Sequence, residues 1–229
     1  MGTDTDNPVK GRPHGRRSGP RTLVAILIPV GATLVLASVV LAIFAVRNYN
    51  PAEEHKNRAF CMNNLKTMGA AIELYHKTVG HYPRTRSGIR FLLAPLEARI
   101  LDPASTPLED IVRNTYACPG DVYAMDALAD VAKYYGDPAN IDPRVFSYAG
   151  RNTIDYPLDR KKAAIEVIAC DAGGADGCGL NHRDAVNVLY LDGSVEFIDL
   201  TELPGDVREN FKVGPDSPIP ALRVLNKDL

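Results

Sequence analysis

Tryptophan is missing from this chain of 229 residues, and aromatic residues make up only 7% of it. The 26 basic and 28 acidic side chains leave a formal net charge of −2, so the chain lacks the net basic character typical of nucleic-acid binding. Its 18 glycines and 17 prolines are too few for a collagen-like or wholly disordered chain. We therefore expect a folded domain, with or without an appendage, and no nucleic-acid partner.

The sequence also lacks the local patterns of common enzymes. No Gly-x-Ser-x-Gly elbow, phosphate-binding loop or His-Glu-x-x-His pattern occurs in it. No Cys-x-x-Cys pair occurs either, so the four cysteines do not have the spacing of a zinc knuckle. These absences predict a non-enzymatic protein without a cofactor.

Residues 22–46 form an uncharged, strongly apolar block near the start of the chain. A run of roughly 20 apolar residues is long enough to cross the hydrocarbon core of a bilayer. The apolar part of a cleaved signal peptide is only about 7–15 residues long, although small residues between Ala37 and Ala45 keep cleavage open as an alternative. The block predicts a transmembrane signal anchor over 22–46, and a buried core helix is the less favoured alternative.

Basic residues lie mainly before this block, in a tail over residues 1–21, whereas only Arg47 follows it closely. The tail carries Lys10, Arg12, Arg16, Arg17 and Arg21. Basic flanks stay in the cytoplasm, so we expect a single-pass protein of the cytoplasmic membrane. Its N-terminus would lie inside, and residues 47–229 would form an extracytoplasmic part.

The first segment expected outside the cytoplasm, 47–80, has the start and stop signals of an amphipathic helix. Asn50 is a candidate N-cap and Pro51 occupies the first helical position. Gly80 supplies a stop signal. Apolar residues spaced by three and four predict one buried face; they are Cys61, Leu65, Met68, Ile72, Tyr75 and Val79.

Residues 81–203 read as a mixture of short helices and strands. Helices are expected over 89–100 and 123–135, and short strands over 145–149 and 164–169. Asp192-Gly193 separates two β-forming runs, 186–191 and 194–198, and predicts a hairpin with a two-residue type I′ turn. The proline-rich residues 204–229 are expected to form an extended surface tail. The predicted fold class is α+β, with the long helix packed on a small antiparallel sheet.

Four stretches of this sequence, in order, resemble the prepilin-type processing-associated H-X9-DG family, which is related to type IV pilins and type II secretion pseudopilins. His182 is followed by nine residues and then by Asp192-Gly193. The other three stretches are CMNNLK with its continuation to Pro83, YACPGD (116–121) and FSYAGRN (146–152). The resemblance implies a pilin-like fold.

The sequence departs from this family at the pilin leader. Gly19-Pro20-Arg21-Thr22-Leu23-Val24 stands where members commonly have Gly-Phe-Thr-Leu-Ile-Glu, which makes processing by a prepilin peptidase improbable. We therefore expect a pilin-like domain on a permanent anchor, as a structural component or partner of a secretion or surface-assembly apparatus. The alternatives are a tethered ligand- or calcium-binding envelope module and, without any supporting motif, an anchored hydrolase.

His182 and Asp192 could suggest acid–base chemistry, because a carboxylate can orient an imidazole. The strand between them, at roughly 3.3 Å per residue, would separate the two by about 20 Å. We therefore interpret Asp192 as a turn former and His182 as a loop residue bonded to a backbone carbonyl or a neighbouring carboxylate.

Cys61, Cys118, Cys170 and Cys178 form an even set in a part of the chain expected outside the cytoplasm, where disulfides persist. Of the three possible pairings, we favour Cys61–Cys118 with a local Cys170–Cys178 bridge. Four reduced cysteines are the alternative.

Asp171, Asp176 and Asp184 lie in or near a glycine-rich loop. Calcium prefers several oxygen ligands on such loops, and the resemblance points the same way because secretion pseudopilins bind calcium near their C-terminal sheet. The spacing does not match an EF-hand, so these residues are calcium candidates beside the simpler interpretation as a solvated turn.

Overall fold

The structure is a computed structural model, and it describes residues 37–38, 50–101, 108–121, 146–172 and 180–228. The chain divides into two compact units, Met1–Asn50 and Pro51–Leu229, and the elements below all belong to the second. No helix within the described part of the chain combines the length and apolarity needed to cross a bilayer. The predicted anchor over 22–46 lies outside the described residues except at positions 37 and 38.

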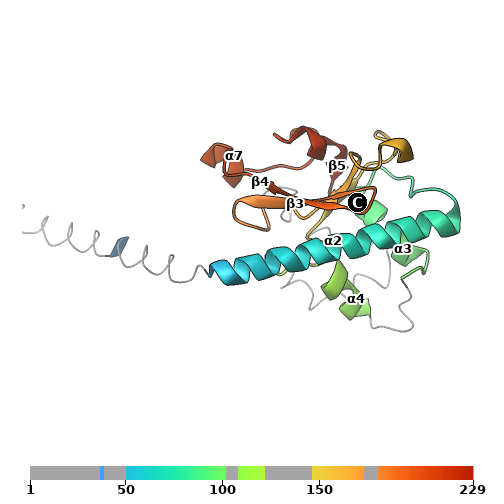
Figure 1. Ribbon diagram of the computed structural model, residues 1–229, viewed down its shortest axis with the longest axis horizontal. Coiled ribbons are helices and arrows are strands. Elements are labelled where there is room, and N and C mark those ends of the chain that lie inside the picture. Colours follow the sequence, from blue (N-terminus) through green and yellow to red (C-terminus); the bar gives the residue numbers. More distant parts are fainter. Residues whose placement is uncertain (1–36, 39–49, 102–107, 122–145, 173–179, 229) are drawn as a thin grey trace, which may run out of the picture. The chain divides into compact units, whose positions relative to one another are not determined.

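The long helix α2 spans Pro51–Val79 and closely matches the predicted helix (Figure 1). Four residues of the predicted apolar stripe are buried, namely Cys61, Leu65, Met68 and Ile72. The stripe ends there, since Val79 is 41% exposed. Gly80 follows with a φ of 88°, a left-handed conformation that commonly ends helices.

Two shorter helices complete the helical part. Helix α3 spans Gly88–Glu97, where the prediction began one residue later, and the Ser87 side chain caps it by accepting from the Arg90 N–H. Pro95 is tolerated inside the last turn. Helix α4, Leu108–Thr115, was not predicted. The helix expected over 123–135 lies outside the described residues.

Five antiparallel strands form one sheet in the order β4-β3-β2-β1-β5. The strands are β1 (Ala149–Arg151), β2 (Val167–Cys170), β3 (Ala185–Tyr190), β4 (Val195–Asp199) and β5 (Leu225–Asn226), and the short 3-10 helix η4 (Arg160–Lys162) precedes β2. The α+β class is therefore confirmed. The strands predicted over 145–149 and 164–169 were right in kind but begin four and three residues too early.

The β3–β4 hairpin forms as expected, but its turn differs from the prediction. The Gly193 N–H donates to the Tyr190 carbonyl, and the Tyr190 N–H donates to the Ser194 carbonyl. Gly193 has a φ of 84°, whereas Asp192 has no positive φ. The loop thus has three residues and ends on a left-handed glycine, so the expected two-residue type I′ turn is wrong.

The predicted surface tail is also wrong for most of its length. Residues 204–229 contain helix α7 (Gly205–Glu209), the 3-10 helix η5 (Pro220–Val224) and strand β5. Strand β5 pairs with β1 and forms one edge of the sheet. Prolines at the start of a helix and outside the paired residues are compatible with this structure, so a high proline content did not indicate an unpacked tail.

Strands β1, β2 and β3 are buried on both faces of the sheet, in two separate clusters, whereas β4 is partly exposed. The first contains the α2 stripe and α3 residues together with Ile168, Ala169 and Leu189. The second lies between the sheet and the C-terminal segment and contains Phe211 and Leu222 (Figure 1). A register shift between Val167 and Ala169 interrupts the alternation of β2, which explains why Ile168 and Ala169 belong to the same cluster.

Candidate functional site

Three of the four stretches that carry the family resemblance meet at one place in the fold, together with the His182 end of the fourth. From α2, the Asn64 amide donates to the Ala117 carbonyl and to the Tyr148 hydroxyl, both at 3.1 Å. The Ser147 hydroxyl accepts from the Cys118 N–H at 2.8 Å. The Asn181 amide donates to the Ser147 carbonyl at 2.6 Å. These residues are distant in sequence, so the matched positions serve first to join segments of the core.

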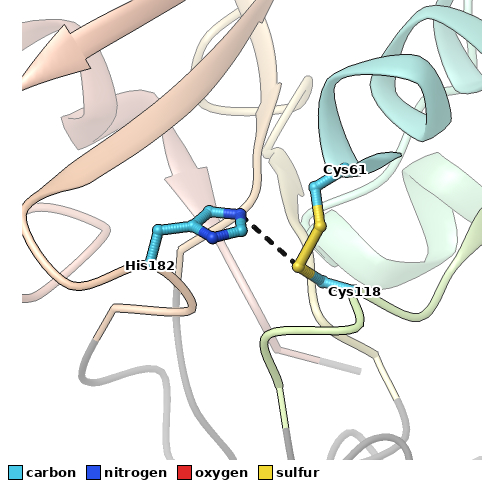
Figure 2. Close-up of side chains that lie close together, drawn as sticks. All are labelled: Cys61, Cys118 and His182. Carbon is cyan, nitrogen blue, oxygen red and sulfur yellow. Dashed lines mark hydrogen bonds between the residues drawn. A yellow bond between two sulfur atoms is a disulfide. The ribbon is translucent and has the colours of Figure 1, made fainter. Parts of the chain in front are cut away.

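A disulfide between Cys61 and Cys118 lies at the centre of this junction, as the favoured pairing predicted. Both cysteines are 0% exposed, and the bond joins α2 to the segment after α4 (Figure 2). The cysteines are 57 positions apart. Chain-entropy reasoning gives such a closure about 4 kcal/mol of stabilisation.

His182 lies beside the disulfide with its side chain completely buried (Figure 2). Its Nε2 is 3.5 Å from Sγ of Cys118 and 3.2 Å from Oδ2 of Asp171. Its Nδ1 is 3.3 Å from Oε1 of Glu54 in α2, but the direction is not that of a hydrogen bond, and Nδ1 has no hydrogen-bond partner among the described residues. We refer to Cys61, Cys118, His182, Asp171 and Glu54 as the disulfide–histidine centre.

Asp171 is held in place from the neighbouring strand. Its carboxylate accepts from the Asn187 backbone N–H at 2.7 Å and from the Asn187 side-chain amide at 2.5 Å. The side chain of Asp171 is 0% exposed. Burial of Tyr148 raises the pKa of its phenol well above the ordinary value, and the nearby negative charge of Asp171 raises it further. Asn187 of β3 therefore fixes one carboxylate of the centre.

Gly120 allows two of the motif segments to approach each other closely. A Cβ added at this position would lie 2.3 Å from the Asn181 carbonyl oxygen and 3.4 Å from Cε1 of His182. A backbone oxygen cannot move aside as a flexible side chain can. A glycine at 120 is thus needed to bring the Cys118 segment against the His182 segment.

Cys170 is a free, buried thiol, so the predicted Cys170–Cys178 bridge is wrong. Its side chain belongs to the second cluster, on the sheet face that the C-terminal segment covers, whereas Cys61 and Cys118 belong to the first. Burial raises the pKa of Cys170 to about 12. Cys178 lies outside the described residues.

Asp192 and His182 belong to opposite ends of strand β3 and to different environments. Asp192 is part of the hairpin loop, where its carboxylate accepts from the N–H and the hydroxyl of Ser194 at 2.9 and 2.6 Å. Those hydrogen bonds lower the pKa of Asp192. The arrangement agrees with a turn-forming role for Asp192 and, for His182, with a loop residue that faces carboxylates.

The calcium candidates are not brought into a common site by the described residues. Asp171 is engaged by Asn187, and Asp184 pairs with Arg208 at 2.5 Å. Asp176 lies outside the described residues. Within the described ranges, the one group of three residues that could hold a metal ion is Cys61, Cys118 and His182.

Two residues of this site were not predicted from the sequence. Glu54 belongs to the disulfide–histidine centre, and Asn187 holds Asp171 in place. Glu54 was one of two acidic residues in the first turn of a predicted helix, and Asn187 was a polar residue within a predicted strand. A polar residue in an otherwise apolar strand was a usable signal for Asn187. Nothing in the sequence distinguishes Glu54 from Glu53, since the contact depends on a residue 128 positions later.

Comparison with known proteins found no relative of this chain. No family model, no curated protein and no solved structure matches this chain.

Proposed function

We propose that the chain is a non-enzymatic, pseudopilin-like protein of the cell envelope. In this proposal residues 22–46 anchor it in the cytoplasmic membrane, and residues 51–229 act outside the cytoplasm as a structural component or partner of a secretion or surface-assembly apparatus. The family resemblance and the apolar block supply the first part of the argument.

The observation that carries the proposal is the buried disulfide that fixes α2 to the rest of the domain. A structural disulfide fits an oxidising compartment. Helix α2 begins at Pro51, only a few residues after the predicted anchor, as expected for an anchor that continues into a packed helix. The burial of His182 supports the non-enzymatic part, because its side chain is 0% exposed in the folded, oxidised domain.

Helix α2 also offers an apolar surface for a partner. Phe60 and Leu74 are 38% and 49% exposed, and they lie about four helical turns apart, which places them on nearly the same face. The two side chains are about 21 Å apart along the helix, and in this proposal each contacts another envelope protein.

Affinity purification from detergent-solubilised membranes tests the proposal. We expect secretion or pilus-like proteins to be recovered with the full chain and to be lost from the F60S/L74S double variant. The I165S variant is the matched control, because Ile165 is 71% exposed and lies outside α2. Recovery of the chain alone, or equal recovery of partners with the α2 variant, would contradict the proposal.

A tethered ligand-binding module is the second candidate. One observation favours it: a pocket of about 490 Å³ next to the hairpin, lined by Lys66, Glu73, Arg160, Asp192 and Gly193 among others. Glu73 and Arg160 already pair with each other at 3.0 Å across this pocket, so much of its charge is satisfied internally. Recovery without protein partners in the purification above would favour this candidate.

A further inference from the structure

We propose that Cys61, Cys118 and His182 form a metal site that the disulfide closes and that reduction opens. The site would bind a borderline-soft divalent ion such as Zn²⁺. The two sulfur atoms and an imidazole nitrogen lie within 4.8 Å of one another, and all three residues are buried. Thiolate and imidazole are the ligands that zinc prefers. The inference does not depend on the envelope role proposed above.

The distances around Nε2 of His182 already suit a tetrahedral zinc ion. Bond lengths of about 2.0–2.1 Å to nitrogen and about 2.3 Å to sulfur require about 3.5 Å between the two ligand atoms. The distance from Nε2 to Sγ of Cys118 is 3.5 Å (Figure 2). The two sulfur atoms, once no longer bonded, would need to separate to about 3.8 Å.

A water molecule would supply the fourth ligand. Asp171 is adjacent, since its Oδ2 is 3.2 Å from Nε2 of His182, but its carboxylate does not belong to the group of ligand atoms within 4.8 Å of one another. Asn187 fixes that carboxylate through two hydrogen bonds. Two thiolates, one imidazole and one water molecule would make a complete four-coordinate site.

Glu54 is placed to orient the imidazole. Metal-binding histidines usually donate the second ring N–H to a carboxylate or a carbonyl. Nδ1 of His182 is 3.3 Å from Oε1 of Glu54 but makes no hydrogen bond with it in the oxidised state. Binding of Nε2 to a metal would leave the proton on Nδ1, and a small ring rotation would direct it to Glu54.

The opening step is a thiol–disulfide exchange with a dithiol, either a protein dithiol or a small one, and it requires a local opening of the fold because both cysteines are 0% exposed. The dithiol attacks one sulfur of the Cys61–Cys118 bond and ends as a disulfide, so it loses two electrons and two protons. Cys61 and Cys118 gain them as two thiols. Zn²⁺ then binds as both thiol protons leave to solvent.

Cobalt provides the direct test, because Co²⁺ bound to thiolates has a charge-transfer absorption band. The full chain in detergent is compared before and after reduction and titrated with Co²⁺ alone, with circular dichroism to follow the fold. We expect one equivalent of thiolate-bound Co²⁺ in the reduced protein and none in the oxidised protein. Affinity should fall at least tenfold in H182Q and about 10–100-fold in E54Q.

Two matched controls define the site. H81Q removes an exposed histidine outside the cluster, and C170A/C178A removes the other two cysteines; both should keep the band. The proposal is overturned if the folded, reduced protein binds no Co²⁺, if H182Q binds it as tightly as the parent, or if C170A/C178A loses it. Should reduction unfold the chain, Co²⁺ must restore the native circular dichroism, and failure to do so also overturns the proposal.

Discussion

At the residue scale, burial decides which polar side chains of this protein can react. Cys170 shows this most clearly, because burial raises the pKa of its thiol from 9.0 to about 12. The thiolate is the reactive form, and it is scarce at neutral pH in a group with so high a pKa. The residue therefore behaves as a small apolar side chain in the second cluster.

We expect Cys170 to resist alkylation in the native protein at about pH 8 and to react once the chain is unfolded. Mass spectrometry of the peptide that contains Cys170, after maleimide treatment with and without urea, measures this. Equal labelling in both conditions would show that the thiol is accessible and that the β2 face is not covered as described.

The matched motif positions could be predicted as important at this scale, but their roles could not. Asn64 and Ser147 are polar residues in motifs, and each proves to hold a neighbouring segment through hydrogen bonds. Their partners lie far away in sequence, and a single sequence does not encode which distant segment each one meets. The role of Cys61 was easier to predict, because its position on an apolar stripe indicated that its sulfur points into the core.

At the scale of elements, the C-terminal segment contributes a whole layer of packing. Phe211 is 0% exposed in the second cluster, and β5 completes the sheet beside β1. The segment was predicted as a tail because prolines interrupt it and no periodic apolar pattern reveals it. Short elements held by tertiary contacts leave little periodicity in the sequence, whereas α2 and the β3–β4 hairpin are long or regular enough to be read directly.

Phe211→Ala should lower the free energy of unfolding by about 3–5 kcal/mol, because it removes a fully buried aromatic ring and leaves a cavity. Phe60→Ala is the matched control, since Phe60 is 38% exposed, and its cost should be much smaller. Urea unfolding followed by circular dichroism measures both variants. A similar small loss in the two would mean that the C-terminal segment does not pack on the sheet.

At the scale of the whole molecule, two buried tyrosines predict loss of stability in alkali. Tyr116 and Tyr148 are fully buried, and burial raises the pKa of both phenols above their ordinary value of 10.0. Above pH 10 the unfolded chain loses these protons while the native protein keeps them. The native state then binds more protons, so its stability falls as pH rises; below pH 10 the two states bind these protons alike.

The expected fall is about 1.4 kcal/mol per pH unit for each such group between pH 10 and its native pKa. Urea unfolding at about pH 8 and about pH 11 compares the two sides of this range. The Tyr116→Phe variant should lose the part of the pH dependence of stability that comes from Tyr116, while the part that comes from Tyr148 remains. A stability that does not change between the two pH values would contradict the burial of these phenols.

We propose that the domain of residues 51–229 is carried outside the cytoplasm on an N-terminal anchor. Protease accessibility in spheroplasts tests it most directly, using a tag on the N-terminal tail and an antibody against the domain. We expect added trypsin to digest the domain while the short tagged tail with its anchor stays in the membrane fraction. A domain that survives trypsin until the spheroplasts are lysed would contradict it.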